Sequence, residues 1–207
     1  MLDIWDEYKR RYPDEILDID GIVNEAIYRN EKNKVLFVLK ETNDLNGSLC
    51  EFLNHGAPGN GRKTWQPCCK WAGALIDEDK KAYSTSDERK GTLQRIAAIN
   101  LKKISGTATS SNDYINWAKE HIDLLKKQFD EINPDIIVLC CNNEGNKFIC
   151  ENILALSKRE WTEDKKLTSF KATTWNGKLI IWARHPLFAQ NQWTEAFRRA
   201  HQKYVAD

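Results

Sequence analysis

Short apolar runs alternate along this chain with longer stretches in which apolar residues recur every three or four positions. Each short run is apolar almost throughout, a pattern typical of strands that are buried on both faces of a sheet. Four such runs are predicted to be strands: Val35–Leu39, Ile96–Leu101, Asp135–Cys141 and Leu179–Ala183.

The stretches between these runs have the periodicity of amphipathic helices. This periodicity predicts two helices before the first run, the second of them from Asp14 to about Arg29. Asn133-Pro134 should end a later helix, because proline lacks a backbone N–H and restricts the residue before it. The pair Asn176-Gly177 predicts a tight hairpin turn, since both residue types accept positive φ. The later helices are predicted over Trp65–Ile76, Tyr114–Ile132, Glu144–Leu156 and Thr194–Val205.

Strands that alternate with helices predict a parallel sheet with helices on both faces. We therefore expect an α/β fold, a three-layer α/β/α sandwich around a central, mainly parallel four-stranded sheet. No internal repeat, linker or break in composition divides the chain, so residues 1–207 are expected to form a single domain. In such sheets ligands bind beyond the carboxyl ends of the strands, where functional side chains are therefore expected.

Composition and charge narrow the class of protein. Apolar residues make up 41% of the chain and charged residues 29%, a balance typical of globular proteins. The sequence contains no apolar run of about 18 residues and no signal-peptide pattern, so no membrane contact and a cytoplasmic location are expected. The net charge is +1, so any contact with nucleic acid must come from a local basic face.

The six cysteines are interpreted as reduced thiols. Cys68-Cys69 and Cys140-Cys141 are adjacent pairs, which bridge only with unusual geometry, and no Cys-x-x-Cys spacing occurs. The second pair lies in an apolar run, where a thiol behaves as a small hydrophobic group. Since the four histidines are also scattered, we expect no metal and no cofactor.

Polar segments follow each predicted strand and together supply a carboxylate, amides, an imidazole and several cations. A carboxylate can position a water molecule, an amide can pair with the edge of a base, and an imidazole can stabilise charge on a leaving group. These groups are the ones required to hydrolyse an N-glycosidic bond. The segments are Lys40-Glu41-Thr42-Asn43, Asn100-Leu101-Lys102-Lys103, Cys141-Asn142-Asn143 and Arg184-His185-Pro186.

The order of these segments resembles the uracil-DNA glycosylase superfamily over roughly residues 34 to 190. The resemblance implies a monofunctional DNA glycosylase that flips a nucleotide out of DNA, removes its base and leaves an abasic site. Relatives act on uracil or, in antiviral enzymes, on bulky modified cytosines of phage DNA, so uracil and glucosylated hydroxymethylcytosine both stay open as targets. The matching stretches are Val35–Asn43, Ile99–Lys103, Asn133–Leu139 and Ala183–Pro186.

The resemblance also implies roles for individual residues. Glu41 matches the acidic residue of the first motif, near the sugar C1′, with Asn43 as the alternative polar group. Asn100 matches the amide that reads the flipped base, and His185 matches the imidazole that donates to the base carbonyl. Trp65 matches, by position only, the aromatic platform on which the base stacks.

The chain also departs from the family pattern. The first motif lacks the usual Gly-Glu-Ala-Pro-Gly, and the last reads His-Pro-Leu-Phe instead of His-Pro-Ser, which changes the segment that enters DNA. The Cys-x-x-Cys of the iron–sulfur branches is absent, so no cluster is expected. DNA is the expected partner, and no obligate protein partner is evident. Five basic residues are predicted to form a phosphate-binding rim: Arg62, Lys63, Lys102, Lys103 and Arg184.

Each candidate also has a purely structural interpretation. His185 could cap a strand, Glu41 could pair with a neighbouring lysine, and Asn100 could satisfy backbone groups at a strand end. Asn142-Asn143 is interpreted as a strand-to-helix turn. Two other functions stay open: a hydrolase of free nucleosides or nucleotides, which needs no phosphate-binding rim, and a non-catalytic module that binds modified DNA or a partner.

Overall fold

One mixed sheet of seven strands organises the protein, whose computed structural model describes residues 2–45, 47–77, 83, 85–106, 113–156, 160–164, 166–189 and 192–206. Its strands are β1 (Gly21–Ile22), β2 (Val35–Leu39), β3 (Ile96–Asn100), β4 (Ile136–Leu139), β5 (Thr162–Asp164), β6 (Leu167–Trp175) and β7 (Lys178–Trp182). They lie in the order β1-β3-β2-β4-β7-β6-β5. The α/β class is confirmed, whereas the predicted four-stranded sheet is wrong because three further strands extend it.

The four predicted runs form the parallel centre of this sheet. Strand β2 pairs in register with β3 on one side, from Val35 with Ile96 to Leu39 with Asn100, and with β4 on the other. Strand β7 continues the parallel set beyond β4. Every residue of β2, β3 and β4 is buried, which explains why these strands are apolar without alternation.

The added strands pair antiparallel at the two edges of the sheet. At one edge β1 pairs with β3, and at the other β6 pairs with β7 and β5 with β6. Strand β6 alternates buried Phe170 and Ala172 with half-buried polar residues, a mixed pattern that the search for continuous apolar runs does not detect. The predicted hairpin turn is confirmed, with Asn176 and Gly177 at φ of 49° and 72°.

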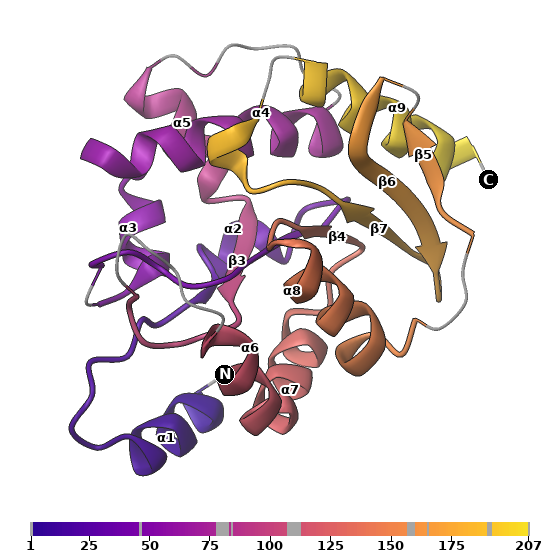
Figure 1. Cartoon of the computed structure of the whole chain (residues 1–207). Coiled ribbons are helices and arrows are strands. Elements are labelled where there is room, and N and C mark those ends of the chain that lie inside the picture. The colour runs from indigo at the N-terminus through magenta and orange to yellow at the C-terminus, as the bar shows by residue number, and fades with distance from the viewer. Residues whose placement is uncertain are drawn as a thin grey trace.

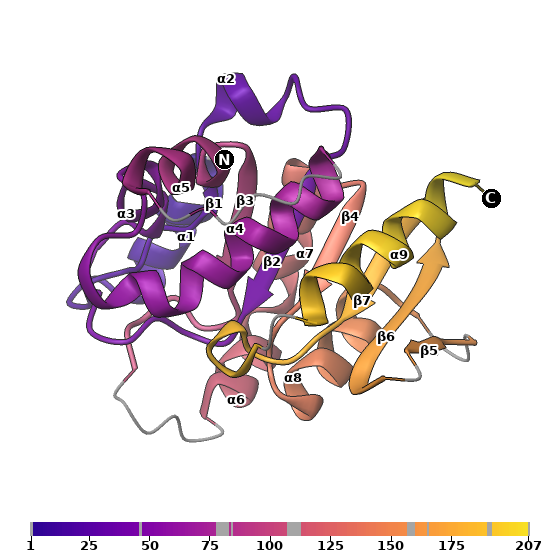
Figure 2. The same ribbon diagram turned by 90° about the horizontal axis from the view of Figure 1, so that it is seen from above.

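Helices cover both faces of the sheet (Figure 1). One face carries α3 (Leu49–Asn54), α4 (Arg62–Ile76), α5 (Ser86–Leu93) and α9 (Gln192–Ala206); the other carries α6 (Asp113–Glu120), α7 (Ile122–Ile132) and α8 (Asn143–Phe148). Helices α4 and α9 lie side by side (Figure 2), and Trp71 stacks on Phe197 between them with ring centroids 4.6 Å apart. The remaining helical segments are α1 (Leu2–Arg11), α2 (Glu25–Tyr28), η1 (Gly59–Gly61), η2 (Ile149–Ile153) and η3 (Pro186–Phe188).

The helix predicted from Asp14 to about Arg29 is wrong. Most of this segment is non-helical and includes β1, and only Glu25–Tyr28 is helical. The spacing of its apolar residues resembles that of a helix, but Asp18 and Asp20 are fully buried and bond to groups on the sheet loops. These tertiary contacts override the local pattern.

Two other predicted helices are each divided. The helix predicted over Tyr114–Ile132 breaks at His121, whose ring Nδ1 lies 2.7 Å from the Trp117 carbonyl oxygen. The helix predicted over Glu144–Leu156 begins as α8 and continues as the π-helical turn η2. The break at Asn133 is as predicted, since this residue caps α7 with a left-handed φ of 45°.

The connections place a switch point at the carboxyl end of β2. The chain leaves β2 toward the layer of α3 and α4, but it leaves β3 and β4 toward the layer of α6, α7 and α8 (Figures 1 and 2). Loops that diverge in this way leave room between them, which is why ligands of open parallel sheets bind at such points.

The hairpin turn gives a test of backbone conformation with an internal control. A Cβ at Gly177 or at Gly91 would meet no atom within 4 Å, but only Gly177 has a positive φ, of 72°. We expect Gly177→Ala to lower the free energy of unfolding by about 1 kcal/mol, and Gly91→Ala, inside α5, to raise it by about 0.5–1 kcal/mol. Urea unfolding of both variants measures the difference, and two shifts of the same sign would contradict the turn geometry.

Candidate functional site

The loops that follow β2 and β3 continue the pairing of these strands. The Lys102 N–H donates to the Lys40 carbonyl and the Gly106 N–H donates to the Thr42 carbonyl, each at 2.9 Å. The loop that carries Glu41 therefore lies directly beside the loop that begins at Asn100. Two of the polar segments predicted from the sequence are thus brought together by main-chain bonds.

Glu41 is held between these loops. Its carboxylate lies 3.5 Å from Lys102 Nζ, and its side chain is 9% exposed. A Cβ at Gly106 would lie 2.4 Å from Glu41 Cδ, so glycine at this position lets the carboxylate pack against the neighbouring backbone. Asn43 lies in the same loop, is exposed and bridges to Gly106. Of the two side chains, Asn43 is open to solvent and Glu41 is held between the loops.

Asn100 is buried at the end of β3. Its backbone N–H donates to Asp20 Oδ2 at 2.7 Å, and its carbonyl accepts from Lys103 Nζ at 2.7 Å. Its side-chain Nδ2 is buried and has no hydrogen-bond partner among the described residues. Buried amide donors are rarely left unpaired, so this amide is an unsatisfied donor at the end of β3.

A second buried aspartate braces the loop after β2. Asp18 accepts hydrogen bonds from the Thr42 hydroxyl, from Ser105 Oγ at 2.7 Å and from the Gly47 N–H at 3.1 Å. Sequence reasoning missed both Asp18 and Asp20 because it assigned them to a helix. A usable signal was present, since two aspartates at alternate positions of an apolar segment also fit an extended strand with one polar face.

His185 follows β7 and begins η3 as its N-cap. Its Nδ1 accepts the Leu187 N–H at 3.3 Å, so a neutral ring carries its proton on Nε2. Burial, together with the positive charge of Lys40, lowers the pKa of His185 to about 4. At neutral pH the imidazole is therefore uncharged and offers Nε2–H as a hydrogen-bond donor.

Lys40 lies near the ends of three strands. It follows β2, its Nζ lies 5.7 Å from the centre of the Tyr114 ring, and its charge acts on His185 after β7 and on Cys141 after β4. Lys40 belongs to the first polar segment predicted from the sequence, but it was not assigned a role there. Its position directly after a buried strand was the available signal.

The segment after β4 is structural, as predicted. Asn142 caps α8 through a hydrogen bond from the Gly145 N–H to its Oδ1 at 2.9 Å. Asn146, which is buried, donates from Nδ2 to the Leu139 and Ala183 carbonyls at 3.2 and 3.3 Å. It thereby joins the ends of β4 and β7 and supports the segment that carries His185.

Two residues predicted at the site are placed elsewhere. Lys103 was predicted to bind phosphate, but it is 0% exposed and its Nζ bonds Asp20, the Asn100 carbonyl and Gln128. It cannot reach DNA without breaking an ion pair. Trp65 was predicted to stack on a base, but it is buried in the apolar cluster between the sheet and α4. Both predictions are wrong because sequence position does not reveal which side of a loop or helix faces the core.

The other predicted cations remain at the surface or near it. Arg62 and Lys63 are exposed at the start of α4 and, with Lys70, line a cavity of about 480 Å³ whose described charged side chains are all cationic. Arg184 is also exposed, and its Nε donates to Ser169 Oγ at 2.8 Å. Lys102 is half-buried beside Glu41. These four residues retain access to solvent, as phosphate contacts require.

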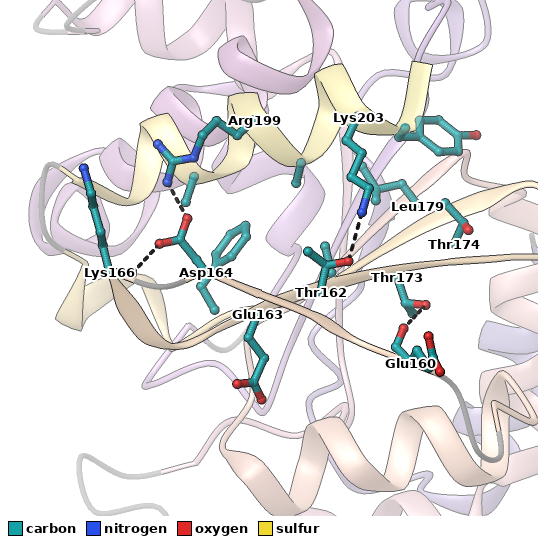
Figure 3. A pocket seen from close by; sticks show the side chains of 15 residues that line it. Glu160, Thr162, Glu163, Asp164, Lys166, Thr173, Thr174, Leu179, Arg199 and Lys203 are labelled. Carbon is teal, nitrogen blue, oxygen red and sulfur yellow. Dashed lines mark hydrogen bonds and ion pairs between the residues drawn. The ribbon is translucent and has the colours of Figure 1, made fainter. Parts of the chain in front are cut away.

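A larger cavity of about 540 Å³ lies between the β5–β6 hairpin and α9 (Figure 3). Phe170 and Leu179 are among its apolar lining residues, and two of its cationic side chains bond to residues on the hairpin. Arg199 pairs with Asp164, and Lys203 donates to Thr162 Oγ1 at 3.2 Å. Glu41, Asn100 and His185 are not among the residues that line it, so this cavity is separate from the strand-end site.

Within the described part of the chain, no group of three or more His, Cys, Asp or Glu side chains is placed to hold a metal ion. No helix in these same ranges is long and apolar enough to cross a membrane.

The pKa of His185 can be measured directly. An NMR titration of the histidine ring signals should give a midpoint near 4 for His185. Lys40→Met should raise this midpoint only partway toward the ordinary value of 6.5, because burial is the larger cause of the shift. Lys126→Met removes the same charge from α7 and serves as the control, with no expected change. A wild-type midpoint near 6.5 would contradict the lowered pKa, and a midpoint above neutral pH would contradict the neutral donor.

Comparison with known proteins adds no family assignment: the chain matches no protein-family model and no curated protein sequence.

Proposed function

We propose that this protein is a monofunctional DNA glycosylase that hydrolyses the N-glycosidic bond of a nucleotide flipped out of DNA. The observation that carries the proposal is the neutral imidazole of His185, with its donor at Nε2, at the carboxyl edge of a parallel sheet beside Lys40. The order of motifs that resembles the uracil-DNA glycosylase superfamily supports the same function. The α/β fold with a central parallel set of strands is compatible with it.

The reaction separates a base from its sugar. The bond between C1′ and the base nitrogen breaks, its electron pair leaves with the base, and the sugar becomes positively charged. Nε2–H of His185 donates to the base carbonyl oxygen where negative charge develops, and the ammonium of Lys40 adds a favourable charge nearby. Water, oriented by Glu41 or Asn43, then bonds to C1′ and gives up a proton that the departing base finally accepts.

Asn100 supplies recognition in this scheme. Its unpaired Nδ2 can donate to an acceptor on the edge of the base, and its carbonyl Oδ1 can accept from an adjacent N–H. Uracil offers both groups. A glucosylated hydroxymethylcytosine offers a different edge and a bulky substituent, and it is kept as the second substrate to be tested.

Two surface features favour DNA over a free nucleoside. Leu187 and Phe188 follow His185 directly and are 52% and 67% exposed, so they can enter a base step as the target nucleotide leaves it. The basic cavity of Arg62, Lys63 and Lys70 lies at the start of α4, a helix that packs against η3. It is suited to bind phosphates of the same DNA strand.

The first test is the formation of alkali-labile sites in DNA. Oligonucleotides with uracil and phage DNA with glucosylated hydroxymethylcytosine are incubated with the protein, and abasic sites are expected on at least one of them. His185→Ala should lower the rate at least about 100-fold, because it removes the donor to the leaving base. His55→Ala, an exposed histidine at the end of α3, is the matched control and should keep full activity.

Absence of abasic sites on both substrates, despite tight binding of DNA, would overturn the enzymatic proposal and favour a non-catalytic DNA-binding module. Turnover of free nucleosides without turnover of DNA would favour the nucleoside hydrolase.

The basic cavity is tested through the salt dependence of binding. Arg62→Ala/Lys63→Ala should weaken binding to all DNA sequences and reduce the slope of log K against log salt by about 1 for each phosphate that the protein no longer neutralises. Lys32→Ala/Lys126→Ala removes the same charge from residues near the amino ends of β2 and β4 and should leave the slope unchanged. Equal slopes for both double variants, measured by fluorescence anisotropy, would place the phosphate-binding residues elsewhere.

A further inference from the structure

A fully buried ion pair lies beneath Asn100. Lys103 Nζ is 2.8 and 2.9 Å from the two carboxylate oxygens of Asp20, and both side chains are 0% exposed. Gln128 of α7 completes the group, since its Oε1 accepts from Lys103 Nζ at 2.8 Å and its Nε2 donates to Asp20 Oδ1 at 2.7 Å. The Lys103 ammonium also lies 5.8 Å from the centre of the Trp5 ring.

Burying this ion pair carries a large desolvation cost. Burial raises the pKa of Asp20 and lowers that of Lys103, and their mutual attraction opposes both shifts. Apolar side chains of similar size usually stabilise a core at least as well as a buried ion pair, so stability alone does not account for it. A role in fixing one conformation of the surrounding chain would account for the ion pair, and the contacts of Asp20 and Lys103 indicate such a role.

Both main-chain polar groups of Asn100 form hydrogen bonds with this ion pair. The Asn100 N–H donates to Asp20 Oδ2 and the Asn100 carbonyl accepts from Lys103 Nζ, each at 2.7 Å. Holding both groups restricts the rotation of the backbone at Asn100 and therefore the direction of its Cα–Cβ bond. No other described residue bonds the side-chain Nδ2, so the hydrogen bonds at the Asn100 backbone help to set the direction of this amide.

We propose that Asp20 and Lys103, braced by Gln128, are positioning residues that orient the Asn100 carboxamide toward the base. This inference rests on the proposed glycosylase function and adds three residues that do not themselves touch the substrate. They come from separate parts of the chain: the extended segment before β1, the loop after β3, and α7 on the far layer.

The test neutralises the pair without leaving a lone buried charge. In Asp20→Asn/Lys103→Met the carboxamide oxygen can still accept the Asn100 N–H, but the Asn100 carbonyl loses its donor. The single-turnover rate of base excision, on whichever substrate the wild type cleaves, should fall about 10- to 100-fold, as expected when a substrate-reading group is misplaced by a fraction of an ångström. The affinity for DNA should change less than about threefold, because the surface residues that bind phosphate remain.

A double-mutant cycle separates positioning from general damage. In an Asn100→Ala background the same two substitutions should change the rate less than about twofold, since the group they orient is already absent. Excess enzyme and long incubation allow slow variants to be quantified. An equal fall in rate with and without Asn100 would overturn the positioning role.

Two further variants keep the inference testable. Glu31→Gln/Arg95→Met neutralises another ion pair, at 2.6 Å, far from the site, and should lower stability but not the excision rate. If Asp20→Asn/Lys103→Met does not fold, Gln128→Met replaces it, with an expected fall of about fivefold that again disappears in the Asn100→Ala background. A wild type without excision activity would overturn the proposed function, whereas an active wild type and equally active variants would overturn only the positioning inference.

Discussion

The burial of β2 on both faces and along both edges is the constraint on which the rest of the structure depends. This strand pairs in register with β3 and β4, and its residues pack into the apolar clusters on both sides of the sheet. Because no side chain of β2 reaches solvent, polar chemistry at this strand can begin only where it ends. Lys40, Glu41 and Asn43 follow at that point, beside the loop that continues from Asn100.

Buried polar contacts then decide the shape of these loops. The extended segment before β1 carries Asp18, which joins the loops after β2 and β3, and Asp20, which holds the loop after β3. Asp18 accepts hydrogen bonds from Thr42, Ser105 and the Gly47 N–H. Asp20 accepts from the Asn100 N–H and forms an ion pair with Lys103. Unlike apolar packing, such bonds are directional and tolerate little rotation. The loops of the candidate site are therefore held by hydrogen bonds to buried carboxylates as well as by the pairing of the strands they follow.

Electrostatics at the opposite end of the site follow from the same arrangement. His185 is anchored through Nδ1 to the Leu187 N–H and is kept neutral by burial and by the charge of Lys40. In the proposed reaction, a neutral imidazole donates a hydrogen bond without transferring a full proton, which suits a leaving group that departs as an anion. Leu187 and Phe188, both exposed, follow this group directly, and α4, which carries the basic cavity at its start, packs against η3.

The sequence by itself determined the four central strands, the Asn176-Gly177 turn and the polar segments that follow those strands, because apolar runs and turn residues act locally. Only the tertiary structure decided that Lys103 and Trp65 face the core, that the segment around Asp18 and Asp20 is extended, and that the sheet gains three edge strands. Periodicity reports which positions are apolar, but it does not report the partner of a buried charge or the side of a loop that packs inward. Those choices depend on contacts between residues that are far apart in the chain, such as Asp20 with Lys103 and Gln128.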